Sequence, residues 1–151
     1  MIGRRTLNVI SRTHRWLYRR TGGRIGGRLL GMEQVLITTT GRTTGTRRTT
    51  PVCAFPFEER DGGGGTDGRV VLVASDGGRE QHPQWYRNLC VHPDITVQRG
   101  RRSIAMRART ATPAERDRLW PRIVAVYGGY VQYQARTERE IPLVVCEPLA
   151  P

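Results

Sequence analysis

The sequence has no lysine, so its formal net charge of +12 comes entirely from arginine. Glycine is frequent as well, with 18 among 151 residues, and part of the basic character therefore reflects a biased composition. Charge of this size is compatible with nucleic acid, an anionic membrane surface or a multiply charged small ligand, and by itself it does not choose among them. The length predicts one domain with a single sizeable core.

Cysteine is scarce, and long apolar runs are missing. Cys53, Cys90 and Cys146 are isolated and form no C-x-x-C pair, which argues against a disulfide framework or a zinc site. We expect all three cysteines to be buried and to act as small hydrophobic side chains, in a protein kept in a reducing compartment. Without an uninterrupted apolar run the sequence predicts neither a secretory signal nor a membrane-spanning helix, so a cytoplasmic location is expected.

Motifs of conventional catalysis are absent too. The sequence has no G-x-S-x-G, no G-x-G-x-x-G after a strand and no Walker pattern. His14, His82 and His92 lack the spacing of a metal-binding pair, and we expect no metal. This combination indicates that a bound coenzyme supplies the chemistry while the protein positions it.

Short β-branched segments bounded by glycine, proline or charged residues predict six strands. They are Val35–Thr39, Val52–Phe57, Val70–Ala74, Ile95–Gln98, Ile104–Ala108 and Leu143–Cys146. Six short strands in this length indicate an α+β fold built on a mainly antiparallel barrel, which we place at residues 32–151. The polar, glycine-rich stretch Glu58–Arg69 is expected to be a mobile surface loop.

Residues 1–31 form a separate N-terminal segment in this interpretation. Residues 6–20 predict a basic amphipathic helix, and the glycine-rich residues 21–31 predict a linker. With Trp16 among its arginines, residues 1–20 suit peripheral contact with an anionic membrane, and docking on the chain's own domain is the alternative.

Two further helices are expected inside the barrel domain. One runs over Pro83–Val91, with proline at its first position. The other begins at Thr112, where a threonine followed three residues later by Glu115 predicts a capping box, and it continues through Tyr127. Pro121 should kink this second helix unless its first turn is a separate element.

The segment Thr38–Pro51 is the strongest candidate for binding chemistry. It contains eight threonines, three arginines and two glycines, and it predicts a hairpin connection between two strands. Gly41 and Gly45 can adopt positive φ and direct amides at one ligand, and the arginines can grip phosphate or carboxylate oxygens. A solvated basic hairpin is the alternative.

Two other clusters carry polar chemistry. Residues 74–78 follow a strand and lead toward a helix, an arrangement suited to anions or to the edge of a polar heterocycle. Trp85 and Tyr86 are either core aromatics or a ligand wall. Tyr127, Tyr130 and Tyr133 fall close to one face of a helical turn, and three phenols together favour a pocket rim over a dry core.

Five ordered motifs resemble the deazaflavin (coenzyme F420)-dependent nitroreductase and quinone reductase family. They are Thr39 to Gly45 with Arg48 and Pro51, Ala74-Ser75 to Gly78, His82-Pro83 to Leu89, Trp120-Pro121, and Tyr127 to Gln134 with Thr137, Arg139 and Ile141-Pro142. The resemblance implies a split β-barrel of the FMN-binding type. It also implies that reduced coenzyme F420 delivers hydride to quinones, nitro compounds or other electron-poor acceptors.

The resemblance further implies a set of site residues. The phosphate end of the coenzyme would be held by Arg42, Thr43, Thr44, Arg48, Thr49 and Pro51, with Thr50, Val52 and Cys53 beside them. The ring and ribityl chain would be held by Val73, Ala74, Ser75, Asp76, Gln84, Trp85, Tyr86, Arg87, Asn88 and Tyr130. Tyr127, Tyr130, Tyr133 and Ser75 are the expected catalytic residues, because a phenol or hydroxyl there could hydrogen-bond a developing oxyanion.

Two positions depart from the family pattern. Thr43 stands where lysine is common, which removes one cation from the loop expected to bind the coenzyme tail. Cys53 stands where a larger residue is common, so the substrate preference of the family does not transfer, and we expect quinone reduction ahead of nitro reduction. The alternatives are an FMN-dependent split-barrel oxidoreductase, or a flavin-binding protein. A nucleic-acid-binding module is more distant, because no nucleic-acid motif accompanies the charge, and we expect no nucleic-acid partner.

Overall fold

The computed structural model describes residues 15–16, 19–20, 28–29, 31–57 and 68–150. Most of the predicted amphipathic helix, most of the linker and nearly all of the glycine-rich loop lie outside these residues. Residues 15–16 and 19–20 are helical. Within the predicted linker, β1 (Arg28–Leu29) pairs antiparallel with the next strand, so the linker prediction is wrong for these two residues.

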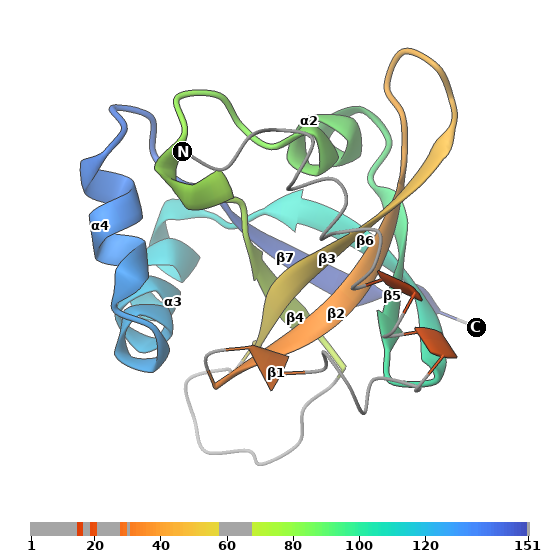
Figure 1. Cartoon of the computed structure of the whole chain (residues 1–151), viewed down its shortest axis with the longest axis horizontal. Helices are drawn as coiled ribbons and strands as arrows, with labels where there is room; N and C mark the ends of the chain where they lie inside the picture. Colours follow the sequence, from red (N-terminus) through yellow and green to blue (C-terminus); the bar gives the residue numbers. More distant parts are fainter. Residues whose placement is uncertain (1–14, 17–18, 21–27, 30, 58–67, 151) are drawn as a thin grey trace.

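Six antiparallel strands form a closed barrel (Figure 1). They are β2 (Met32–Thr40), β3 (Arg47–Pro56), β4 (Val70–Val73), β5 (Asp94–Arg99), β6 (Arg102–Thr110) and β7 (Leu143–Pro148). The order along the sheet is β1-β2-β3-β4-β7-β6-β5, and pairing of β2 with β5 closes it. The mainly antiparallel barrel predicted from the sequence is confirmed.

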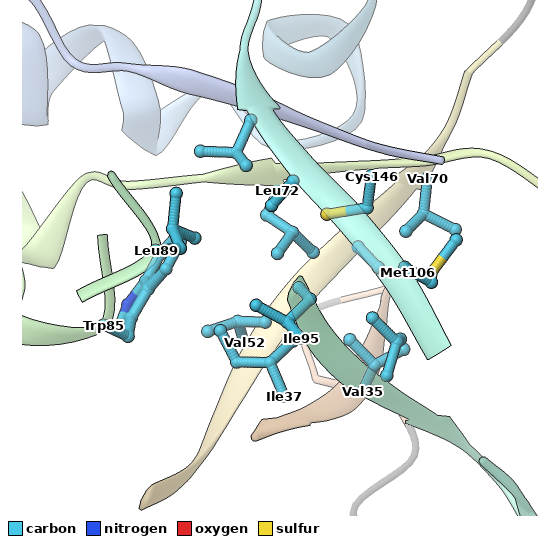
Figure 2. Packing of buried hydrophobic residues seen from close by; sticks show 14 of the residues in the cluster. Val35, Ile37, Val52, Val70, Leu72, Trp85, Leu89, Ile95, Met106 and Cys146 are labelled. Carbon is cyan, nitrogen blue, oxygen red and sulfur yellow. The ribbon is translucent and has the colours of Figure 1, made fainter. Parts of the chain in front are cut away.

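The interior of the barrel is filled by alternate residues of its strands. On β3 the even-numbered Val52 and Ala54 point inward, as Leu72 does on β4 and Cys146 on β7. Side chains alternate between the two faces of a strand, so one register fills the interior from every strand. Figure 2 shows these aliphatic and sulfur-containing side chains converging on one apolar centre.

A second core lies on the outer face of the same strands. Phe55 of β3, Val71 of β4 and Val145 of β7 pack there against helices α3 (Pro113–Val126) and α4 (Gly129–Ala135). Figure 1 shows the two helices together on one side of the barrel. The central strands are therefore buried on both faces, which explains why segments such as Val70–Val73 are continuously apolar.

Helix α2 (Gln84–Val91) covers one end of the barrel, near the β2–β3 hairpin (Figure 1). Its buried residues Trp85 and Leu89 belong to the interior cluster, and Figure 2 shows both side chains reaching into it. The predicted helix is confirmed, but Pro83 is its N-cap in extended geometry rather than its first helical residue. Of the two readings of Trp85, the structure shows the core aromatic.

Several other boundaries differ from the prediction. Helix α3 continues through Pro121 as one element, so its first turn is not separate. It ends at Val126, and Gly128 caps a distinct helix, α4, that the sequence patterns did not predict. Cys146 is buried, whereas Cys90 is exposed, contrary to the expectation that all three cysteines are buried. Among the described residues no helix combines the length and apolarity needed to cross a bilayer.

The start of α3 combines a capping box with an ion pair. Thr112 Oγ1 accepts from the Glu115 amide at 3.2 Å, and the Glu115 carboxylate accepts from the Thr112 amide at 2.8 Å. Arg109 of β6 donates to both carboxylate oxygens, at 2.7 and 2.8 Å. The Arg109 hydrogen bonds are the main reason why the pKa of Glu115 falls to about 2 from 4.5.

We predict that Glu115→Gln lowers the free energy of unfolding by about 1–2 kcal/mol at pH 7, because it removes charge-assisted hydrogen bonds and half of the capping box. The folded-state pKa is depressed, so the stabilisation is present above pH 4.5 and is lost as pH falls toward 2. Urea titrations should therefore show the free energies of unfolding of the variant and the wild type converging as the pH is lowered over that range. Asp117→Asn, an exposed carboxylate of the same helix, should change little.

Candidate functional site

The β2–β3 hairpin is longer and its turn shorter than predicted. Thr38 to Thr40 and Arg47 to Pro51 are strand residues in register, with Thr40 opposite Arg47. Only the residues between Thr40 and Arg47 turn. Gly45 takes φ +69°, whereas Gly41 has negative φ and is required by space, since a Cβ there would lie 2.7 Å from Thr44 Oγ1.

Arg42 joins the hairpin turn to helix α2. Its amide donates to Asn88 Oδ1 at 3.2 Å, and its Nη1 donates to Asn88 Oδ1 at 2.9 Å and to Gln84 Oε1 at 2.8 Å. Asn88 is buried, so these bonds also satisfy a polar side chain removed from water. Three predicted coenzyme-binding residues thus lie together, and the guanidinium is bonded to neutral amides rather than to a carboxylate.

The remaining polar residues of the hairpin form an exposed basic surface. Thr43, Thr44 and Arg48 are exposed, and Arg47 donates to Thr40 Oγ1 at 3.0 Å. Thr49 hydrogen-bonds Thr38 through their hydroxyls at 2.9 Å. We call Arg42, Thr43, Thr44, Arg47, Arg48 and Thr49 the basic hairpin surface. Such a set of guanidinium and hydroxyl donors is suited to an anion.

Two arginines of the N-terminal segment reach the same surface. Arg19 Nη2 donates to Thr49 Oγ1 at 3.2 Å, and Arg15 donates to the Thr49 carbonyl. Sequence patterns assigned both arginines only to the polar face of a helix. Their position adds two more cations beside the hairpin.

The outer face of β3 leads from the basic hairpin surface to the tyrosine cluster. Thr49, Pro51 and Cys53 alternate onto this face, so Thr49 and Cys53 are about 13 Å apart along the strand. Cys53 Sγ accepts from Gln34 Nε2 at 2.8 Å and interacts with the Tyr130 hydroxyl. Burial raises the pKa of the Cys53 thiol, which keeps it protonated.

The three tyrosines form a compact cluster. The Tyr130 ring lies 5.2 Å from that of Tyr127 and 5.9 Å from that of Tyr133, and the Tyr127 and Tyr133 hydroxyls are 3.1 Å apart. Tyr130 is only 4% exposed and its hydroxyl lies 3.8 Å from Met32 Sδ. The expected pocket rim is therefore wrong for Tyr130, because the outer core packs around its ring, while Tyr127 and Tyr133 are partly exposed.

The electrostatic environment keeps the Tyr130 and Tyr133 phenols protonated. Burial is the main cause that raises the pKa of Tyr130, and the hydrogen bond between the Tyr133 and Tyr127 hydroxyls is the main cause that raises the pKa of Tyr133. A phenol with a raised pKa is a hydrogen-bond donor at neutral pH rather than an anion.

The 74–82 loop follows β4 and contains a short 3₁₀ turn, η1 (Asp76–Gly78). A Cβ on Gly78 would lie 2.4 Å from the Tyr133 carbonyl oxygen, so the loop touches the backbone of α4. Ser75 is buried, while Asp76 is exposed and pairs with Arg79 at 3.8 Å. Predicted residues of the loop and of the tyrosine cluster are thus neighbours.

Other predicted residues turn their side chains elsewhere. Val52 and Trp85 lie in the interior core and Val73 in the outer core, so their side chains pack within the protein. The Tyr86 hydroxyl hydrogen-bonds Thr110 at 2.9 Å. Arg87 is exposed.

Sequence reasoning missed several contacts in this region. Gln34 contacts Cys53, and Arg139 bonds the 74–82 loop, where His82 stacks beside Tyr86 with ring centroids 4.9 Å apart. The contact of Gln34 could not be predicted, because a buried polar residue and a polar residue on an exposed strand face look alike in the sequence. Arg139 belonged to a recognised motif, but one arginine among 25 basic residues gives no separate signal.

Comparison with known proteins identifies the family and the fold of this chain. The family model described as F420H(2)-dependent quinone reductase matches residues 10–148. An F420H(2)-dependent quinone reductase of Mycobacterium tuberculosis is 37% identical over 138 residues, covering 89% of this chain and 87% of that protein. The solved structure of an F420-H2 dependent reductase is 35% identical, with a TM-score of 0.61, over 76% of this chain and 93% of that chain.

A heme storage protein from Vibrio cholerae shares the fold at 10% identity and a TM-score of 0.53, over 78% of this chain and 82% of that one. The barrel alone therefore does not decide the activity. Fold and relatives together define an oxidoreductase that works with a bound coenzyme. The chain belongs to the F420H(2)-dependent quinone reductase family, and its coenzyme is reduced F420.

We predict that Gly78→Ala lowers the free energy of unfolding by about 2–4 kcal/mol, because a methyl group would overlap the α4 backbone at a residue with φ +80°. Gly77→Ala is the matched control. It has φ +66° and nothing within 4 Å of the added carbon, so only backbone strain of about 1 kcal/mol is expected. Equal losses in urea titrations would show that the contact with Tyr133 contributes nothing.

Proposed function

We propose that this protein reduces quinones with coenzyme F420H2, holding the anionic part of the coenzyme at the basic hairpin surface and the acceptor beside the tyrosine cluster. The coenzyme supplies a hydride when bound. Overall the quinone would gain one hydride and one proton, the two hydrogens that the reduced coenzyme gives up, and would become a quinol. The observation that carries this proposal is that the outer face of β3 connects an arginine- and threonine-rich surface at Thr49 with the buried phenol of Tyr130 at Cys53.

Arg42, Arg48 and the hairpin threonines would bind phosphate oxygens. Arg42 is suited to this role because its partners Gln84 and Asn88 are neutral, so no carboxylate among the described residues pairs with it. Hydrogen bonds to α2 also hold the guanidinium in place before a ligand arrives, which lowers the entropic cost of binding. Thr44, Thr49, Thr50 and Pro51 would complete this end, with Thr43 contributing a hydroxyl where relatives commonly have a cation.

The backbone of residues 73–76 and the exposed part of α2 would hold the ring and ribityl chain. Val73, Ala74 and Trp85 would contribute backbone groups or packing, since their side chains are buried. Asp76, Gln84, Tyr86, Arg87 and Asn88 offer polar groups. The residues present thus fit an anionic, hydroxyl-rich coenzyme.

Tyr133, Tyr127 and Ser75 would face the acceptor and donate hydrogen bonds to the oxygen on which negative charge develops. Tyr130 would act from behind them, since its buried ring supports both partly exposed tyrosines. The raised pKa values of Tyr130 and Tyr133 keep these two phenols protonated at neutral pH, and no side chain is required as a strong base. Proximity and orientation would supply most of the rate enhancement.

Nitro compounds and other electron-poor acceptors are a second class of substrate, since hydride transfer followed by protonation serves them equally. Binding of FMN in place of F420 is the remaining alternative within this fold. The membrane contact expected of residues 1–20 stays a prediction, supported by the 57% exposed Trp16 ring beside Arg20.

We predict that oxidised F420 binds the purified protein with saturable fluorescence quenching, and that Arg48→Gln weakens binding about tenfold by removing a charge-assisted contact. Arg101→Gln is the control, since this exposed arginine lies in the β5–β6 turn at the other end of β2. Tighter binding of FMN, or equal losses in both variants, would contradict the proposed site.

We predict that Tyr133→Phe lowers kcat for quinone reduction about tenfold through loss of one hydroxyl donor, while F420 affinity stays within about twofold. Steady-state assays with menadione together with the F420 titration separate the two effects. An unchanged kcat would remove Tyr133 from the acceptor edge.

A further inference from the structure

Arg139 lies between α4 and β7 and contacts the 74–82 loop through its whole guanidinium group. Nη2 donates to the Ser75 carbonyl at 2.7 Å, Nη1 to the Ala74 carbonyl at 3.2 Å, and Nε to the Arg79 carbonyl at 2.8 Å. Nη1 also lies 3.1 Å from His82 Nδ1. One side chain therefore bonds four acceptors of a single loop.

This loop is held in a costly conformation. Asp76, Gly77 and Gly78 have φ values of +44°, +66° and +80°, so three consecutive residues occupy the left-handed region. Asp76 is the one positive-φ residue other than glycine in the described part of the chain. Such a conformation persists only where surrounding contacts hold it. Arg139 supplies those contacts from one side of the loop.

Arg139 is itself fixed to the end of α4. The Gln134 side chain donates from Nε2 to the Arg139 carbonyl at 2.7 Å and accepts from the Ile141 amide at 2.9 Å. Gln134 directly follows Tyr133 on this helix. Hydrogen bonds therefore connect the helix that carries the tyrosines with the loop that carries Ser75.

The carbonyl contacts also set the direction of the backbone amides. No peptide bond in the described residues is cis, and in a trans peptide the N–H points opposite to the carbonyl. Because the carbonyls of Ala74 and Ser75 point at Arg139, the amides of Ser75 and Asp76 point away from it. The guanidinium thus determines which way this part of the loop faces.

We propose that Arg139 is a positioning residue that holds the 74–82 loop and so fixes Ser75 relative to Tyr133, without itself touching coenzyme or acceptor. The role in catalysis depends on the proposed function, since it acts through Ser75. The role in holding the loop does not, and it can be measured in the protein without coenzyme.

His82 provides an independent probe of this arrangement. Burial, followed by the positive charges of Arg139 and Arg87, lowers the pKa of His82, so its neutral ring can accept from Arg139. The Tyr86 ring also packs on His82. Burial raises the pKa of Tyr86, so the Tyr86 phenol stays uncharged at neutral pH. Removing the Arg139 charge should raise the pKa of His82.

The test compares Arg139→Gln and Arg139→Lys with Arg116→Gln. Arg116 is a matched control because it too bonds a backbone carbonyl, that of Ile141, and pairs with Glu140 at 3.6 Å, but it does not contact the 74–82 loop. Hydrogen exchange at the Gly78 and Arg79 amides reports on the loop, since both bond within it. NMR titration reports on His82, and menadione assays give kcat and KM.

We expect Arg139→Gln to speed exchange at the Gly78 and Arg79 amides at least about tenfold, to raise the pKa of His82 and to lower kcat about tenfold. Arg139→Lys should recover the pKa of His82 but only part of kcat, because an ammonium group cannot bond three carbonyls in a plane. Arg116→Gln should lower the melting temperature and leave all three readouts unchanged.

The proposal would be overturned if the Gly78 and Arg79 amides of Arg139→Gln exchanged at the wild-type rate. It would also be overturned if they exchanged faster while kcat stayed unchanged. Equal loss of kcat in Arg116→Gln would also overturn it, because the effect would then be one of stability. If the wild-type protein binds no F420 and reduces no menadione, the proposed function fails instead. Exchange and the His82 titration then decide by themselves whether Arg139 holds the loop.

Discussion

The structure depends on the burial of β3 on both of its faces. Even-numbered residues such as Val52 fill the barrel, and odd-numbered ones such as Phe55 pack under α3 and α4. Because the side-chain period of a strand is two, a slip by one residue would exchange the two cores and move Cys53 into the interior. The same register that builds the cores therefore places the basic hairpin and the tyrosine cluster along one face.

Arginine performs three different physical tasks in this lysine-free chain. Arg99 pairs with the partly exposed Glu33 and Arg107 with the exposed Asp94, and ion pairs open to water contribute little to stability. Arg109 joins a partly buried carboxylate to a helix start. Among the described residues, the hydrogen bonds of Arg42 and Arg139 go to neutral acceptors, so these guanidinium groups fix the position of amide, carbonyl and imidazole groups rather than pairing directly with a carboxylate. Planar, multidentate donors suit that third task better than an ammonium group.

The local features were predictable because local chemistry determines them. Short β-branched segments bounded by glycine, proline or charged residues predicted the six barrel strands, and the spacing of Thr112 and Glu115 predicted the start of α3. The burial of Tyr130 was not predictable, since it depends on which face of β3 the helix α4 covers. The role of each site residue stays a prediction, because the geometry reports neighbours rather than ligands. The order of motifs, rather than any single spacing, identified the family.

Protonation states connect the outer core to the proposed chemistry. Burial raises the pKa of both Cys53 and Tyr130, so neither ionises near neutral pH and the pair can share a hydrogen bond without charge. Tyr133 is kept neutral in turn by its bond with Tyr127. A donor edge of this kind is insensitive to pH below the range where phenols ionise. Burial and the charges of Arg139 and Arg87 lower the pKa of His82 instead, so acid sensitivity of the site would arise in the loop that Arg139 holds rather than among the phenols.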